Sequence, residues 1–139
     1  MKPARMHPPI HAALWLVFAL LLVPASRVPT AFAATRVFSD ADKGATVQLK
    51  VGDVVELHLQ SNPSTGFAWY VHPQSTHLLK IIGQSQTEST EPGVGRPVIQ
   101  IFKFQAVKTG DGVLLLHYVR SWEKPSADEQ QFDLHVSIR

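Results

Sequence analysis

The sequence contains no cysteine among its 139 residues. The protein therefore has no disulfide bond, no thiol nucleophile, no thiolate ligand for a metal ion and no cysteine to which a lipid could be attached. A small domain without disulfides or metals depends on its hydrophobic core for stability. We therefore expect the folded part of the chain to bury an apolar interior of its own.

Residue patterns that mark common enzyme active sites are also missing. The chain has no Gly-x-Ser-x-Gly nucleophile elbow and no His-Glu-x-x-His helix. The five histidines after residue 33 never recur at the i, i+4 spacing of a helical metal site, and His58 and His135 fall on predicted solvent-facing sides of strands. We therefore expect no enzymatic activity, no metal site and no cofactor.

The first 33 residues have the pattern of a secretory signal peptide. Lys2 and Arg5 precede an unbroken apolar run from Ala12 to Val23, and residues 31–33 (Ala-Phe-Ala) have the small residues that signal peptidase recognises. The run is too short to cross a hydrocarbon core of about 30 Å. We expect cleavage after Ala33, although the pattern also fits cleavage after Ala25, and a periplasmic or secreted protein with no membrane attachment after cleavage.

The formal net charge of +2 comes from this leader. Lys2, Arg5 and Arg27 leave with it and no acidic residue does, so residues 34–139 keep ten basic and eleven acidic side chains. Without an excess of positive charge, the domain has no long-range attraction for phosphate backbones, and nucleic acid is not an expected partner. Residues 34–139 are enough for one sandwich-sized domain, which we expect to be monomeric.

Hydrophobic residues in this domain alternate with a period of two, and no amphipathic helical pattern of ten or more residues occurs. The clearest alternations run from Val55 to Gln60 and from Phe132 to Arg139. Seven or eight strands are the number expected of an all-β, immunoglobulin-like antiparallel sandwich. The other expected strands lie near Val37 and at Ala45–Lys50, Phe67–His72, Leu78–Thr87, Val98–Val107 and Val113–Trp122.

Turn-forming residues separate the expected strands, at 50–53, 62–66, 91–97 and 109–112. Two connections, Glu88–Pro97 and Glu123–Gln130, are longer than a tight hairpin needs. Binding residues on a rigid scaffold usually lie in such loops. The connecting loops are therefore the candidate binding elements.

Residues 62–66 predict a stiff loop of small side chains. Asn62 precedes a proline and so favours an extended backbone, and Pro63 fixes its own φ. The hydroxyls of Ser64 and Thr65 can bond nearby backbone groups, and Gly66 can take a positive φ. Such a loop loses little entropy when it is pressed against another surface. Taken by itself, the segment also fits an ordinary turn between two strands.

Together with its surroundings, this loop resembles the signature of the chagasin family of cysteine protease inhibitors, in a bacterial-type member. The resemblance covers nearly all of residues 34–139. It implies an immunoglobulin-like fold and reversible, non-covalent inhibition of papain-like cysteine proteases, whose cleft is occluded by three loops. The segments that carry it are Gly52-Asp53, Leu57-His58-Leu59, 62–69 (Asn-Pro-Ser-Thr-Gly-Phe-Ala-Trp), Gly93-Val94-Gly95, 102–106 (Phe-Lys-Phe-Gln-Ala), Gly110 and 118–122 (Tyr-Val-Arg-Ser-Trp).

The resemblance implies a role for each of the three loops. Residues 62–66 would form the central loop, lying against the catalytic cysteine and histidine of the protease. Arg120 and Trp122 would belong to the third loop, with Trp122 packing on an aromatic surface of the primed side. The loop on the non-primed side would contain Gly93, Val94, Gly95 and Arg96.

Two positions depart from the family pattern. Arg96, followed by a proline, stands at the end of the family's Gly-x-Gly-Gly and makes that loop stiffer and more positive. Ser121 stands where the family has a proline between an arginine and an aromatic residue, which frees one φ angle. Both changes bear on how these two loops would contact a protease.

Other interpretations of the same residues remain open at this point. Trp122 also fits an aromatic that caps the edge of the sandwich, and Arg120 also fits a surface ion pair with Glu123. Trp69 and Tyr118 are expected to pack in the interior. The whole chain also fits a generic exported module that binds a carbohydrate or a surface protein, but the combination of the 62–66 loop with Arg-x-Trp about 55 residues later favours the inhibitor.

Overall fold

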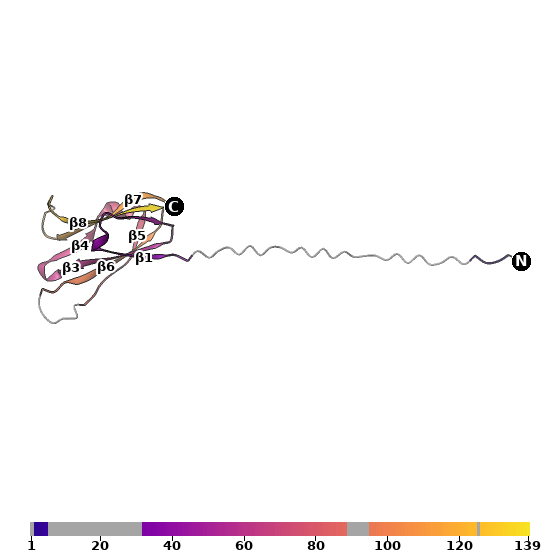
Figure 1. The fold of residues 1–139 in the computed structure, drawn as a ribbon, viewed down its shortest axis with the longest axis horizontal. Coiled ribbons are helices and arrows are strands. Elements are labelled where there is room, and N and C mark those ends of the chain that lie inside the picture. The colour runs from indigo at the N-terminus through magenta and orange to yellow at the C-terminus, as the bar shows by residue number, and fades with distance from the viewer. Residues whose placement is uncertain (1, 6–31, 89–94, 125) are drawn as a thin grey trace. The chain divides into compact units, whose positions relative to one another are not determined.

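The structure is a computed structural model that describes residues 2–5, 32–88, 95–124 and 126–139. Residues 31–139 form a compact unit that holds the eight strands of the described residues (Figure 1). Apart from residues 2–5, 32 and 33, the predicted signal peptide lies outside the described residues and stays a prediction. No helix in the described ranges is long and apolar enough to cross a membrane.

The strands form two four-stranded sheets. One sheet has the order β1-β3-β6-β5 and the other has the order β2-β8-β7-β4. Three short 3₁₀ turns, η1 (Asp40–Asp42), η2 (Pro63–Thr65) and η3 (Pro73–Thr76), lie between strands. The strands are β1 (Thr35–Ser39), β2 (Thr46–Leu49), β3 (Val54–Ser61), β4 (Phe67–Val71), β5 (Leu79–Gln86), β6 (Val98–Ala106), β7 (Gly110–Arg120) and β8 (Gln130–Ile138).

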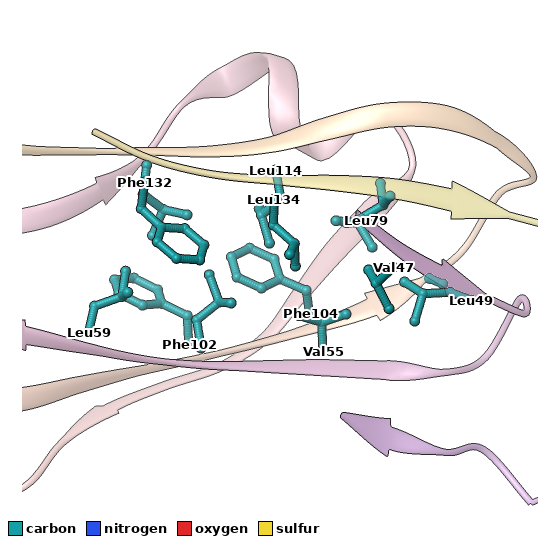
Figure 2. Close-up of a cluster of buried hydrophobic side chains, with 14 of the residues drawn as sticks. Val47, Leu49, Val55, Leu59, Leu79, Phe102, Phe104, Leu114, Phe132 and Leu134 are labelled. Carbon is teal, nitrogen blue, oxygen red and sulfur yellow. The ribbon is translucent and has the colours of Figure 1, made fainter. Parts of the chain in front are cut away.

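The core lies between the two sheets, where alternate side chains of each strand point inward. Figure 2 shows Phe102 and Phe104 of one sheet pointing toward Phe132 and Leu134 of the other. Fully burying one such side chain contributes roughly 1.5–3 kcal/mol, so this interior can stabilise a domain without disulfides. The other buried members are Val47, Leu49, Val55, Leu57, Leu59, Trp69, Leu79, Ala106, Leu114, Leu116, Val136 and Ile138.

The all-β sandwich predicted from the sequence is confirmed, with two differences in detail. β1 pairs with β3, and β2 with β8, in parallel rather than antiparallel. β1 and β3 are separated by one strand of the other sheet, so the chain reverses twice between them and returns in the same direction. Alternation fixes which face of a strand is buried but not its direction. In addition, Gly110 and Gly112 lie within β7 and not in the predicted turn.

Trp69 connects the two sheets near the end of the sandwich that carries the 62–66 loop. It is 2% exposed, as its alternation with Phe67 predicts. Its backbone N–H donates to Gln100 Oε1 on β6 (2.9 Å), and its indole N–H donates to the Gln60 carbonyl on β3 (2.8 Å). Because Gln100 and Gln60 belong to the opposite sheet, these bonds hold β4 against β6 and β3 near the loop.

Candidate functional site

Three connections meet at one end of the sandwich. The pairing of strand ends shows this: Ser61 at the end of β3 pairs with Val98 at the start of β6, and Phe67 at the start of β4 pairs with Arg120 at the end of β7. The connections β3–β4, β5–β6 and β7–β8 therefore leave the sheets on the same side, opposite the C-terminal end of β8 (Figure 1). These are the three loops that the sequence marks as binding elements.

The central connection is held in shape by its own hydrogen bonds. Its residues 63–65 form η2, in which the amide of Thr65 and its Oγ1 both donate to the Asn62 carbonyl (3.1 and 2.6 Å). The hydroxyl of Ser64 donates to Asn62 Oδ1 (2.6 Å), and the amide of Gly66 donates to the Pro63 carbonyl (2.9 Å). Gly66 has a φ of 82°, the positive value that the sequence allows it. The loop is therefore ordered without any partner.

The β5–β6 connection contacts the central loop through Gly95. The side-chain amide of Asn62 donates to the Gly95 carbonyl (3.0 Å), and Gly95 has a φ of 84°. Arg96, the departure from the family pattern, is half-buried next to it. Gly93 and Val94 lie outside the described residues, so their predicted place in the site stays a prediction.

On the other side, Arg120 contacts the central loop. Its Nε donates to the Thr65 carbonyl (2.9 Å), and its guanidinium lies 4.3 Å above the ring of Phe67. The alternative pairing that the sequence left open is also present, because Arg120 NH1 donates to Glu123 Oε1 (2.8 Å). An exposed pair of this kind contributes roughly 0–1 kcal/mol. Arg120 thus fixes the third loop to the central loop, and Glu123 orients the Arg120 guanidinium.

Trp122 lies on the central loop but remains 70% exposed. Its ring approaches Gly66 so closely that a Cβ at position 66 would lie 2.2 Å from Cη2 of the indole. Gly66 is therefore required both for its φ and for this contact. An aromatic that capped the edge of the sandwich would be buried, whereas most of the Trp122 surface faces solvent. Ser121, beside it, is exposed in the same turn.

Tyr118 holds the start of the central loop, a role that the sequence analysis missed. Its ring packs against Phe67 and Trp69, with centroids 5.3 and 5.0 Å away, which fits the predicted packing role. Its hydroxyl also accepts a hydrogen bond from the backbone amide of Asn62 (2.8 Å). A half-buried tyrosine usually has a hydrogen-bond partner for its hydroxyl, and this tendency could have indicated from the sequence that Tyr118 does more than pack.

The base of the third loop is tied to β7 by Glu129. His117 Nδ1 lies 3.0 Å from Glu129 Oε2, and the amide of Ser126 donates to Glu129 Oε1 (2.7 Å). The hydrogen bond from His117, followed by that from Ser126, holds the pKa of Glu129 below its ordinary value. A lowered carboxyl pKa means that this tie stabilises the loop at neutral pH and is lost as acidification protonates Glu129.

The hydrogen bonds of this surface make it a rigid projection. The hydroxyls of Ser64 and Thr65 donate inward to Asn62, and no base lies beside either in the hydrogen bonds of the described residues. Over the described ranges, no three His, Asp or Glu side chains converge as metal ligands. What the surface offers a partner is a stiff tip (Pro63, Ser64 and Thr65, all exposed), with a cation and an exposed indole beside it.

Replacing Tyr118 with phenylalanine is expected to loosen the central loop without disturbing the packing of the ring. Losing one hydrogen bond costs about 1 kcal/mol, so exchange of the Asn62 amide should become about fivefold faster and the melting temperature should fall by a few degrees. Hydrogen exchange followed by NMR measures the first effect. Tyr70→Phe is the matched control, since Tyr70 is an exposed tyrosine of β4. Unchanged exchange at Asn62 in Tyr118→Phe would show that the hydroxyl does not hold the loop.

Comparison with known proteins gives a consistent result. Residues 48–136 match the family model described as Chagasin family peptidase inhibitor I42. Amoebiasin-2 of Entamoeba histolytica is 29% identical over 130 residues, covering 90% of this chain and 98% of its own. Chagasin of Trypanosoma cruzi is 29% identical over 100 residues, covering 69% of this chain and 91% of its own. The crystal structure of a cysteine protease inhibitor from Entamoeba histolytica superposes with a TM-score of 0.68 at 27% identity, covering 77% of this chain and 97% of the other.

Proposed function

This chain belongs to the chagasin family of peptidase inhibitors, and from that premise we propose that it blocks papain-like cysteine proteases by inserting three loops from one end of its sandwich into the active-site cleft. The protein is an inhibitor of cysteine proteases and not an enzyme. The observation that carries the three-loop mechanism is the hydrogen bonding of the central loop to both neighbours, through Gly95 on one side and Arg120 on the other.

Preorganisation is the physical basis of this mechanism. Association costs entropy for every side chain and loop that becomes ordered on binding. In the central loop the internal bonds to Asn62 and the bond from Arg120 to Thr65 exist before any protease is present. The loop can therefore enter a cleft with little further loss of conformational freedom.

The same geometry explains how the loop could occupy a protease without being cut. A peptide substrate lies extended across the cleft, with its scissile carbonyl open to the cysteine thiolate. Pro63, Ser64 and Thr65 instead form a 3₁₀ turn closed by the bond from Gly66 to Pro63. A carbonyl in such a turn is poorly aligned for attack, and misalignment of reacting groups is costly for catalysis. Inhibition is thus reversible and non-covalent.

The two flanking loops supply contacts of different kinds. Trp122 offers a large exposed aromatic surface, which is typical of residues that dominate binding energy in interfaces. Arg120 adds a positive charge beside the central loop. Gly93, Val94, Gly95 and Arg96 complete the proposed contact surface on the opposite side.

We also propose that the inhibitor acts outside the cytoplasm, in the periplasm or after secretion, as a monomer. The basic leader, the apolar run from Ala12 to Val23 and the small residues at 31–33 support export. A domain without cysteine folds independently of the redox conditions on either side of the membrane. The rival proposal, a generic exported binding module, shares these features and is separated by the protease test that follows.

The test of the proposed function is selectivity among protease classes. Residues 34–139 are expected to abolish hydrolysis of a small substrate by papain at a near-stoichiometric dose, and to leave trypsin and a zinc protease active. Titration of each active enzyme with the protein measures this. Full papain activity in the presence of excess folded protein would favour the generic binding module, and equal inhibition of trypsin would contradict a cleft-specific mechanism.

A further inference from the structure

A buried carboxylate lies beside the first residue of the folded domain. Asp53 is 8% exposed, and its Oδ1 accepts a hydrogen bond from the backbone nitrogen of Ala34 (3.0 Å). Its Oδ2 accepts from the amide of Lys50 (2.9 Å). Both partners are neutral backbone groups, and within the described residues no side-chain cation forms an ion pair with Asp53.

The surroundings of Asp53 favour its ionised form. The hydrogen bond from the Lys50 amide does most to lower its pKa, burial opposes this, and the bond from Ala34 and the charges of Arg36 and Lys50 lower it further. The amide of Asp53 donates back to the Lys50 carbonyl (3.0 Å), so the carboxylate is fixed in a turn before β3. A negative charge is therefore held in place beside the Ala34 nitrogen.

Ala34 is where ordered pairing of the chain begins. Its carbonyl accepts a hydrogen bond from the amide of Val54 (2.8 Å), and the parallel ladder of β1 and β3 follows from Thr35 onward. The two residues before it, Phe32 and Ala33, are exposed, Phe32 to 89%. The bond between Ala33 and Ala34 thus lies at the boundary between exposed chain and folded domain.

We propose that the leader is cleaved between Ala33 and Ala34, and that the new α-ammonium group of Ala34 forms an ion pair with the buried carboxylate of Asp53. Hydrolysis adds hydroxyl to the Ala33 carbonyl carbon and hydrogen to the Ala34 nitrogen, and the resulting amine takes up a proton at neutral pH. This proposal rests on the export proposed above. Cleavage after Ala25 would leave the Ala34 nitrogen as an amide and would form no such pair.

Cleavage would stabilise the fold because it replaces a neutral amide donor to the ionised Asp53 carboxylate with a positively charged one. The opposite charges then attract each other in addition to the hydrogen bond, and the low exposure of Asp53 limits the screening of this attraction by salt. The Asp53 carboxylate raises the pKa of the Ala34 α-ammonium group in the folded state. The added stability should therefore be complete below the ordinary α-amino range of about 7.7–8.0 and be lost as pH rises through the folded value.

The test compares three forms of the folded domain, which contains all the described strands and core residues. One begins at Ala34, the second is the same chain with its terminal amine acetylated, and the third begins at Ala33. Acetylation keeps the N–H that bonds Asp53 and removes only the charge. At pH 6 the form with a free Ala34 amine should melt about 5 °C above the other two, and at pH 10.5 the three should agree.

A substitution of Asp53 and the start of the exported protein test the proposal further. Asp53→Asn should remove the difference in melting temperature between the free and acetylated forms. If that variant fails to fold, the pH 6 comparison of the three wild-type forms decides whether the ion pair exists. Equal melting temperatures at pH 6 would overturn the ion pair. N-terminal sequencing of the protein exported from cells expressing the full chain should begin at Ala34, and a start at Ser26 would overturn the cleavage site.

Failure of this proposal is separable from failure of the proposed inhibition. Asp53 precedes β3, whereas the central loop follows that strand, eight residues or about 26 Å away. The three forms should therefore inhibit papain equally at pH 6. Loss of inhibition in all three would count against the proposed function and leave the melting comparison valid.

Discussion

Thr65→Trp is expected to abolish inhibition of papain while the protein remains folded. Thr65 is exposed at the tip of the central loop, away from the core. An indole there would meet the protease surface before the loop could seat, and the internally bonded turn cannot bend to accommodate it. We expect the inhibition constant to rise at least about a thousandfold, or about 4 kcal/mol. Titration of papain, with circular dichroism on the same sample, measures both inhibition and folding.

Two control variants separate steric exclusion from other effects. Thr65→Ala removes the side-chain hydrogen bond to the Asn62 carbonyl without adding bulk. It should weaken inhibition only about fivefold, because one hydrogen bond contributes about 1 kcal/mol. Thr109→Trp places the same indole on an exposed threonine at the opposite end of the sandwich and should leave inhibition unchanged. Normal inhibition by a folded Thr65→Trp protein would mean that this loop does not enter the cleft.

Trp122→Ala is expected to weaken binding strongly and to leave stability almost unchanged. The ring is 70% exposed and contacts Gly66, so its removal costs the free protein little. If it packs on the protease, truncation should cost about 2–4 kcal/mol, or roughly 30- to 1,000-fold, mainly through faster dissociation. Surface plasmon resonance gives the rates, and a thermal melt gives the stability.

Tyr70→Ala is the matched control for Trp122→Ala, because it removes an exposed aromatic from β4, which pairs with the strand that leads to Trp122. Its binding should remain near that of the wild type. A large fall in the melting temperature of Trp122→Ala, with affinity reduced only as far as unfolding explains, would instead assign Trp122 a structural role at the edge of the sandwich.

The sequence predicted those features that depend on local patterns. Alternation located the strands to within a few residues, because one face of each strand must be buried. The stiffness of the central loop followed from Pro63 and Gly66, whose backbone preferences act within the loop itself. The directions of β1 and β2 could not be read in this way, because edge strands can pair in either direction and bury the same side chains.

Contacts between the loops were not predictable from the sequence, because they join residues far apart in the chain. The bond from Asn62 to Gly95 spans 33 residues, and the bond from Arg120 to Thr65 spans 55. The anchoring of Asn62 by Tyr118 depends on the register between β4 and β7. The resemblance named three loops as the contact surface, and the structure supplies the hydrogen bonds that join the central loop to Gly95 and to Arg120.

Binding to papain with an open and with a filled cleft tests the central claim most directly. The protein should bind one-to-one to papain whose catalytic cysteine is replaced by alanine, because the proposed contact is non-covalent and involves no cleavage. It should lose that binding when the cysteine of active papain carries a bulky alkyl group that fills the cleft. Calorimetry measures both. Undiminished binding to the blocked enzyme, or no binding to the alanine variant, would contradict reversible occlusion of the cleft by these loops.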